Sequence, residues 1–397
     1  MIHLLFTLLG LLLFFVTLPL VLEIAVVTAA NILPARKFGG SQQRDAENPA
    51  HSRLNLSIIV PAHNEQLLVA NCVRSLRASA DANTQILVIA HNCTDKTAEN
   101  ARVAGADVLI YDDPSATGKG FALRYGFNHA LANGADVVMV VDADSVVTAN
   151  TVASVRTAFA SGARVVQCRY EMESATDRSS TRLAALAFRG FNVIRPRGRD
   201  RLGLSAGILG NGFAILGPVL GRVPYDAFSL VEDLEYHLHL VMAGERVRYL
   251  DHAIISADFP ESHAGEAVQR SRWEGGRLHT ARNLALGLVA RILRGQARLI
   301  EPLCDLTGLP LAFGVFALLL ALCIPLSWIR VYSAISLGVI ACHVLTAAWA
   351  GPDFLKTLQL LALTPLYILR KLWMIPGVLR GSRAKAAWVR TDRDTTL

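Results

Sequence analysis

Two acidic residues separated by one residue, Asp142 and Asp144, directly follow an apolar run at residues 137–141. A run of this kind without polar alternation is typical of a parallel strand that is buried on both faces. In open α/β sheets, ligands bind beyond the carboxyl ends of such strands. Two carboxylates at that edge favour Mg²⁺ or Mn²⁺, which prefer oxygen ligands and share their coordination shell with substrate phosphates. The alternative is a polar turn with solvated acids, because Asp-x-Asp alone is a weak signal.

Lys119 is a second candidate for chemistry, because it lies between Gly118 and Gly120 at the expected start of a helix. An ammonium group beside free backbone N–H groups can bind phosphate or ribose oxygens. The alternative is an ordinary loop bordered by glycines, with the lysine in solvent.

The segments around these residues alternate between strand and helix patterns. Short apolar runs bounded by turn residues predict strands, and apolar residues at spacings of three and four predict helices. The expected strands are 56–60, 85–90, 107–110 and 137–141, and the expected helices are 65–80, 94–104 and about 118–133. This alternation predicts an α/β fold with a mostly parallel, right-handed, doubly wound sheet.

Apolar segments flank this region and predict a membrane protein, since 52% of the 397 residues are hydrophobic. Residues 2–22 carry no formal charge, and the apolar run continues to Ala30 with Glu23 as its single charge. This is longer than the apolar part of a signal peptide, so we expect a retained transmembrane helix over residues 1–33. A polar linker at 34–54 follows it.

The C-terminal membrane region is expected at residues 303–379. Residues 306–328 and 331–350 predict two spans, whereas 355–379 contains three basic residues and either spans or is re-entrant. Two further stretches, about 182–200 and 286–302, mix arginines with apolar residues and are expected to lie on an anionic leaflet. Basic helices packed on the soluble domain are the alternative.

Charge bias sets the expected orientation. Arg36 and Lys37 follow the first span, and the tail at 380–397 is basic, so both are expected in the cytoplasm. The same bias explains the formal charge of +7 without nucleic acid as a partner. The six cysteines form no C-x-x-C pair and are expected to be reduced, structural thiols.

Seven short motifs occur in one order along residues 55–280, and together they resemble the family 2 glycosyltransferases with the GT-A fold. The motifs are Ile58–Glu65, Asn92–Asp95, Gly118–Leu123, Asp142–Asp144, Gly210–Gly212, Val231–Asp233 and Gln269–Trp273. The last two resemble the membrane-integrated branch, which includes polysaccharide synthases and ceramide glucosyltransferases. The resemblance implies a Rossmann-like GT-A domain, here expected at 55–285.

The resemblance also implies a nucleotide-diphospho-sugar donor. Asp144, with Asp142, would hold the metal ion that bridges the donor phosphates, and Lys119 would bind the phosphate or ribose. The base and ribose would be bound by residues at the neighbouring strand ends, which are Pro61, His63, Glu65, His91 and Asp95. His91 departs from the pattern, because many relatives have an acid there, so the identity of the base is open. Asp95 could instead cap a helix.

On the acceptor side, the resemblance makes Asp233 the general base, with Glu232 beside it. A base opposite a metal-bound leaving group implies direct displacement with inversion. The alternative is a pair of acids that stabilise a helix N-terminus.

Gln269, Arg272 and Trp273 fall on one helical face, which in the family lines the acceptor channel and contacts the pyrophosphate. An amphipathic surface helix with a buried tryptophan is the alternative. Gly210 and Asn211 would allow the backbone to approach an acceptor sugar closely.

The sequence therefore predicts a metal-dependent, inverting glycosyltransferase in a bacterial-type inner or plasma membrane, with its catalytic domain in the cytoplasm. The expected donor is a UDP-sugar that supplies a hexosyl or N-acetylhexosaminyl group. A growing polysaccharide or oligosaccharide is the first candidate acceptor, and a ceramide- or hopanoid-type lipid is the alternative. A non-catalytic membrane scaffold is the third possibility. The expected partners are the donor, the glycan or lipid acceptor and membrane lipids; protein partners and oligomeric state stay open.

Overall fold

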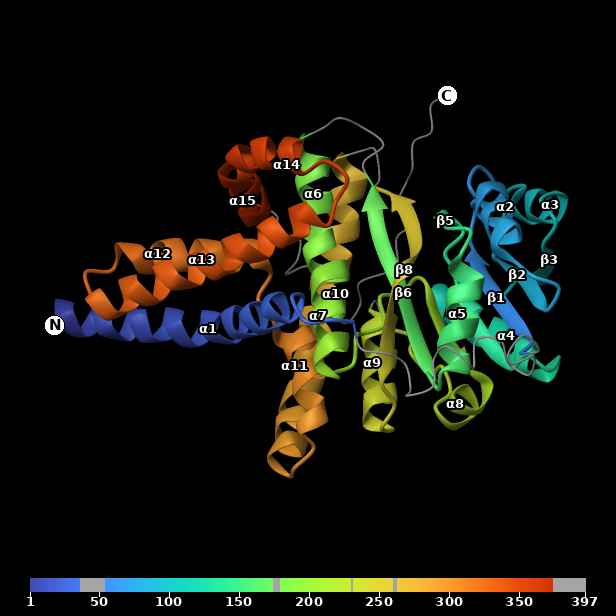
Figure 1. Ribbon diagram of the computed structural model, residues 1–397, viewed down its shortest axis with the longest axis horizontal. Helices are drawn as coiled ribbons and strands as arrows, with labels where there is room; N and C mark the ends of the chain where they lie inside the picture. Colours follow the sequence, from blue (N-terminus) through green and yellow to red (C-terminus); the bar gives the residue numbers. More distant parts are fainter. Residues whose placement is uncertain (36–53, 174–178, 230, 260–262, 374–397) are drawn as a thin grey trace.

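The computed structural model describes residues 1–35, 54–173, 179–229, 231–259 and 263–373 (Figure 1). For residues 263–272 it describes the backbone alone. An eight-stranded mixed sheet forms the body of the molecule, in the order β3-β2-β1-β4-β7-β6-β8-β5. The strands are β1 (Leu56–Ala62), β2 (Thr84–His91), β3 (Asp107–Tyr111), β4 (Val137–Val140), β5 (Ser145–Val147), β6 (Val165–Glu173), β7 (Phe213–Leu216) and β8 (Val247–Asp258).

The predicted parallel strands form one half of the sheet. Strands β3, β2, β1 and β4 are mutually parallel, as are β6 and β8, whereas β7 runs antiparallel between β4 and β6, and β5 is antiparallel to β8. The expected α/β fold is therefore confirmed, with a sheet that is mixed rather than parallel throughout. The parallel half places the ends of β1, β2 and β4 at one edge.

Helices cover both faces of the sheet. One face packs on α2 (Val69–Ser79), α3 (Thr97–Val103) and α5 (Thr151–Ala160), and the other on α4 (Lys119–Ala132), α8 (Gly217–Arg222) and α9 (Glu232–Met242). All four residues of β4 are buried, as a strand covered on both faces requires. The six cysteines are free thiols, as expected.

Helices α2 and α3 begin later than the sequence pattern predicted. Asn64, with a φ of 55°, turns the chain before α2, and its side-chain oxygen accepts a hydrogen bond from the Thr94 backbone N–H at 2.7 Å. The residues before both helices therefore bond to one another instead of extending the helices.

Two helices are long and apolar enough to cross a membrane, α1 (Ile2–Ala30) and α13 (Ser327–Trp349). A third crossing is possible where Ala297–Thr307 and Leu311–Cys323 form a pair bent by 82°, either a broken span or a re-entrant loop. Helices α1, α12 (Leu311–Cys323) and α13 pack together and project away from the sheet (Figure 1). Among the described residues, α1 and α13 are therefore the candidate membrane spans.

The segment expected to be a third, ambiguous C-terminal span is broken into short pieces. It contains α14 (Phe354–Leu360), a 3₁₀ turn (Leu361–Leu363) and α15 (Thr364–Trp373). None of these helices is long enough to be a span, and residues 374–379 lie outside the described chain.

A helical rod joins the sheet to the membrane helices. It consists of α6 (Ser179–Arg189), a π-helical turn (Gly190–Ile194) and α7 (Arg195–Leu202), and it contacts β6 and β8 as well as α1 and α13 (Figure 1). This rod is the stretch that the sequence predicted to be interfacial. Within it, Arg189 pairs with Glu171 and Arg197 with Asp251, so these guanidinium groups also fasten the rod to the sheet.

Candidate active site

The acidic turn between β4 and β5 is held in place by one buried asparagine. The Asn211 side-chain oxygen accepts a hydrogen bond from the Asp142 N–H at 3.1 Å, and its amide donates to the Ser145 hydroxyl at 2.8 Å. Ser145 in turn donates to Asp144 Oδ1 at 3.0 Å. Asn211 is completely buried, so the geometry gives it a positioning role rather than the acceptor contact that the sequence predicted.

The carboxylates of Asp142 and Asp144 both line one cavity. Two neighbouring carboxylates that reach a cavity form the oxygen-donor set that Mg²⁺ or Mn²⁺ requires, so the residues fit such an ion. Burial is the main reason that the pKa of Asp142 is raised. A cation in the turn would reverse this effect by favouring the ionised form.

Lys119 connects the acidic turn to the opposite side of the site. Its ammonium forms an ion pair with Asp142 and donates a hydrogen bond to the Gly210 carbonyl at 2.7 Å. Burial alone would lower the pKa of Lys119, but the carboxylates of Asp142 and Glu232 raise it above its ordinary value. The lysine is therefore a permanent positive charge beside the turn, as phosphate binding requires.

Asp233 lies in the first turn of α9, where its Oδ1 accepts a hydrogen bond from the Leu234 N–H at 2.8 Å. Burial first, and then the neighbouring Glu232 carboxylate, raise the pKa of Asp233 to about 7. A carboxylate with a pKa near neutrality is suited to general-base chemistry. Both Glu232 and Asp233 line the same cavity as the acidic turn.

The expected nucleotide edge is formed by the ends of β1 and β2. Pro61, His63, Glu65 and His91 line the cavity, and the His63 Nδ1–H donates to the His91 carbonyl at 2.8 Å. Asp95 instead accepts hydrogen bonds from the backbone N–H groups of Thr97 at 2.9 Å and Gln66 at 3.2 Å. These bonds hold together the segments that precede α2 and α3, so Asp95 has a structural role here.

His91 ends a stack of three aromatic rings that sequence reasoning missed. Its ring lies 4.8 Å from the Tyr111 ring, which lies 4.6 Å from the Tyr125 ring, with nearly parallel planes in both pairs. Burial lowers the pKa of His91, so the imidazole is neutral at neutral pH. The register of β2 and β3 pairs His91 with Tyr111, and this pairing is the signal that could have revealed the stack.

The expected acceptor helix is α10 (His263–Leu293). Trp273 lines the cavity, and its ring lies 6.5 Å from that of Phe188. The side chains of Gln269 and Arg272 lie outside the described part of the chain. Their expected roles therefore stay predictions.

A single cavity of about 1500 Å³ runs from this site to the membrane helices. Apart from the residues named above, its walls include apolar side chains of α1, α12, α13 and α15, among them Ile24, Val315, Ile340, Val344 and Ile368. The site is thus open towards the membrane part of the molecule.

The family described as "Glycosyltransferase like family 2" matches residues 53–276. The chain belongs to this family. A relative in Bacillus subtilis (strain 168), named "Probable glycosyltransferase YdaM", is 26% identical over 232 residues, which cover 56% of this chain and 54% of the relative. The chain thus spans about half the length of this curated relative.

Solved structures of two glycosyltransferases align with this chain. A mannosyltransferase of Pyrobaculum calidifontis, PcManGT, in complex with GDP-Man and Mn²⁺, aligns with a TM-score of 0.57 and 16% identity over 96% of this chain and 99% of that one. Glucosyl-3-phosphoglycerate synthase of Mycobacterium tuberculosis aligns with a TM-score of 0.42 and 18% identity, over 70% of this chain and 88% of that one. At such identities, the PcManGT alignment establishes a shared GT-A fold and no more.

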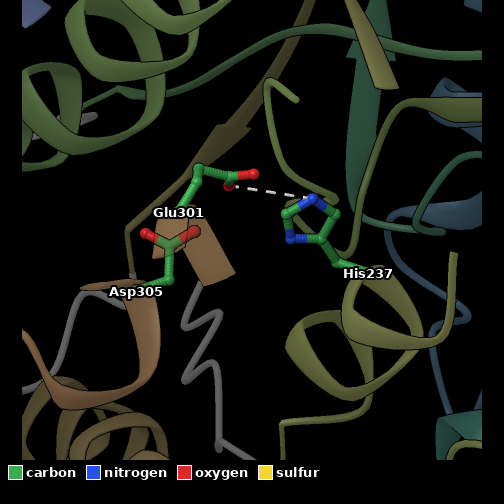
Figure 2. Close-up of side chains that lie close together, drawn as sticks. All are labelled: His237, Glu301 and Asp305. Carbon is green, nitrogen blue, oxygen red and sulfur yellow. Dashed lines mark ion pairs between the residues drawn. The ribbon is translucent and has the colours of Figure 1, made fainter. Parts of the chain in front are cut away.

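This glycosyltransferase has a second cluster of possible metal ligands, His237, Glu301 and Asp305, whose ligand atoms lie within 4.8 Å of one another (Figure 2). Arg199 already donates to Glu301 Oε1 at 3.0 Å and to Asp305 Oδ2 at 2.7 Å. Burial lowers the pKa of His237 to about 4, and its Nε2 hydrogen-bonds the Ser205 hydroxyl at 2.9 Å.

A metal cation in this second cluster would be repelled by the buried guanidinium groups of Arg199 and Arg195. Arg195 also pairs with Asp305, at 2.8 Å. Arg195 and Arg199 both pair with Glu23 of α1, so the cluster joins α1, α7 and α11 (Ile300–Thr307) by ion pairs. Such buried pairs are costly to break from one side. The acidic turn is therefore the better metal site.

Proposed function

We propose that this family 2 glycosyltransferase transfers a sugar from a nucleotide diphosphate to an acceptor that enters from the membrane. The observation that carries this proposal is the single cavity that contains the acidic turn, Asp233 and the apolar walls of α1, α12 and α13. The acidic turn can hold the metal that the donor phosphates need, and Asp233 can deprotonate the acceptor. The apolar walls can hold the apolar part of an amphiphilic acceptor.

On the donor side, Asp142 and Asp144 would hold Mg²⁺ or Mn²⁺, which when bound supplies positive charge to the pyrophosphate. Lys119 adds an ammonium on the same side, fixed by Asp142 and the Gly210 carbonyl. The sequence predicted a UDP-sugar, whereas the PcManGT complex contains GDP-Man and Mn²⁺. Both nucleotide classes therefore belong in the test.

On the acceptor side, Asp233 takes the proton of the attacking hydroxyl. The new bond joins the acceptor oxygen to the anomeric carbon, while the bond from that carbon to the pyrophosphate oxygen breaks and the electron pair leaves with the nucleotide. A base facing the leaving group across the sugar requires one displacement, so the product has inverted configuration. Burial of Asp233 keeps its pKa close to the working pH.

The apolar walls favour a lipid acceptor over the growing glycan that the sequence placed first. A polymer channel needs polar groups along its length, whereas α12 and α13 contribute mostly Leu, Ile, Val and Ala to the cavity. A glycan remains the second candidate, because the exposed ring of Trp273 offers a stacking platform for a sugar. We place the catalytic domain on the cytoplasmic side, supported by Arg36 and Lys37 after α1.

The test uses the full-length protein in lipid nanodiscs with radiolabelled UDP-sugars and GDP-sugars, with Mn²⁺, Mg²⁺ or EDTA. We expect metal-dependent release of the nucleotide and a labelled product that is extracted into organic solvent. A product that stays at the chromatographic origin and is degraded by a polysaccharide hydrolase would support the glycan acceptor instead. Absence of nucleotide release with every donor would contradict the proposed reaction itself.

A further inference from the structure

Arg277 lies on α10 one helical turn after Trp273 and lines the same cavity. Four other cationic side chains of the described chain line that cavity, and each has a carboxylate partner. These pairs are Lys119 with Asp142, Arg195 with Glu23 and Asp305, Arg199 with Glu23 and Asp305, and Lys371 with Glu274. Among the described residues, Arg277 forms no hydrogen bond or ion pair.

An enclosed guanidinium without a partner is costly, because arginine cannot lose its proton to escape burial. Burial, which is the larger cause, and the neighbouring charge of Arg195 lower the pKa of Arg277, although Glu274 opposes them. Glu274 is itself held by Lys371 at 2.9 Å and so does not neutralise Arg277 directly. The described part of the protein therefore supplies no counter-anion that pairs with Arg277.

The charges with the largest effect on Arg277 belong to Glu274, Arg195, Asp305 and Glu23. Glu23 lies in α1 and Asp305 in α11, so Arg277 stands beside the ion pairs that join these helices. The donor pyrophosphate is expected beside the acidic turn and Lys119, so it is not the anion that Arg277 faces. A separate anion is required at the boundary between the polar and apolar parts of the cavity.

The cavity that Arg277 lines is also lined by apolar side chains of α13 and α15, such as Leu337, Ile340 and Ile368. The Thr364 hydroxyl of α15, on another wall, is buried and has no hydrogen-bond partner. An unpaired cation, an unsatisfied hydroxyl and apolar walls in one cavity together match a molecule with one anionic group and an apolar chain.

We propose that Arg277 binds the phosphate or carboxylate of an anionic, amphiphilic acceptor, whose apolar chain lies between α12, α13 and α15. The inference rests on the proposed function, because it names the acceptor class of the same reaction. The planar guanidinium can pair with either anion through two parallel hydrogen bonds. The acceptor hydroxyl would then be held within the cavity that also contains Asp233.

The test compares Arg277→Gln with the wild-type protein in nanodiscs. Arg291→Gln is the matched control, because Arg291 lies on the same helix but is exposed and does not line the cavity. A bacterial lipid extract, separated by anion exchange into anionic and neutral fractions, supplies the acceptors, and transfer of the labelled sugar to each fraction is measured. Metal-dependent nucleotide release in water is measured in parallel as the donor-side reaction.

We expect the wild-type protein to label the anionic fraction and Arg277→Gln to reduce kcat/KM for that fraction by about 10- to 100-fold. Nucleotide affinity and nucleotide release should be unchanged, and Arg277→Lys should recover part of the transfer. The control variant should behave as wild type; an equal loss in Arg291→Gln would mean general attraction to anionic lipid and would overturn the assignment.

Other outcomes separate the two proposals. Labelling of the neutral fraction alone, or full activity of Arg277→Gln on the anionic fraction, would overturn the anionic acceptor and leave the transferase reaction intact. Loss of a co-purifying anionic lipid from Arg277→Gln, with transfer retained, would make that lipid a resident component and not the acceptor. Failure of donor-side nucleotide release in the wild-type protein would instead contradict the proposed function.

Discussion

A β-carbon added to Gly210 would stand 3.3 Å from the Asp233 Oδ2 atom. The Gly210 carbonyl oxygen accepts a hydrogen bond from the Lys119 ammonium, with 2.7 Å between the two atoms. The backbone of Gly210 has a φ of +77°. One residue therefore bonds the group expected to bind the donor phosphates and leaves room for the group expected to deprotonate the acceptor. Its lack of a side chain sets the distance between the two halves of the site.

Gly210→Ala should reduce sugar transfer by more than its effect on stability explains. The methyl group must displace the Asp233 carboxylate by a few tenths of an ångström, and misplacement of a catalytic group lowers the rate by the order of tenfold or more. Gly207→Ala is the matched control, because Gly207 also has a positive φ, +99°, but has open space around its β-position. Equal transfer rates in the two variants, at equal thermal stability, would show that only backbone strain matters.

The raised pKa of Asp233 predicts a pH dependence of transfer. The base acts only when deprotonated, so kcat/KM should rise with pH up to the pKa of about 7 and level off above it. In Asp233→Asn, transfer should fall by about 10²–10⁴-fold, and the residual rate should no longer follow this profile. Asparagine can still accept the Leu234 N–H bond, so folding and nucleotide binding should survive. Near-normal transfer by this variant would move the base to Glu232.

The acidic turn predicts a metal-dependent loss of donor binding. In Asp144→Ala the ion would lose a carboxylate that reaches the cavity, and both turnover and metal-dependent nucleotide affinity should fall. Glu99→Ala, which removes an exposed acid at the start of α3, is the charge-matched control. Calorimetric titration of the nucleotide with and without Mn²⁺ measures the effect. Turnover that is unchanged in EDTA would remove the metal from the mechanism, whatever the variants do.

The positions of the motifs at strand ends could be predicted from sequence, because local patterns determine them. The valine run before Asp142 is one buried strand in the structure, and the apolar N-terminal run is one helix. The role of Asn211 could not be predicted in the same way, since it bonds Asp142 across 69 positions of the chain. The continuous cavity and the unpaired Arg277 also depend on contacts between distant segments. Periodicity carries no information on such contacts.

The number of membrane crossings can be tested at the C-terminus. If the bent pair Ala297–Thr307 and Leu311–Cys323 crosses the membrane once, it and α13 return the chain to the side of the catalytic domain. A reporter fused after Leu397 should then be cytoplasmic, in line with the basic tail. A reporter on the outer side would mean an odd number of C-terminal crossings, with either a re-entrant bent pair or a third span in the segment expected at 355–379.

The joint between the rod and the first membrane helix depends on Gly198 of α7. A β-carbon there would stand 2.3 Å from the Val27 carbonyl oxygen of α1, a backbone atom that cannot move aside without shifting the helix. Gly198→Ala should therefore destabilise the protein by about 1–3 kcal/mol through overpacking. Gly221→Ala in α8 is the control, because its β-position is open and the substitution should be neutral or stabilising by up to about 1 kcal/mol.

Thermal unfolding in nanodiscs, followed by tryptophan fluorescence, measures both glycine variants. The separation of α1 from α7 should also weaken the ion pairs of Arg195 and Arg199 with Glu23, which cross the same joint. Loss of transfer in Gly198→Ala should therefore accompany loss of stability, without a change in the pH profile that Asp233 sets. A Gly198→Ala protein as stable as Gly221→Ala would mean that α1 and α7 do not pack this closely in the membrane.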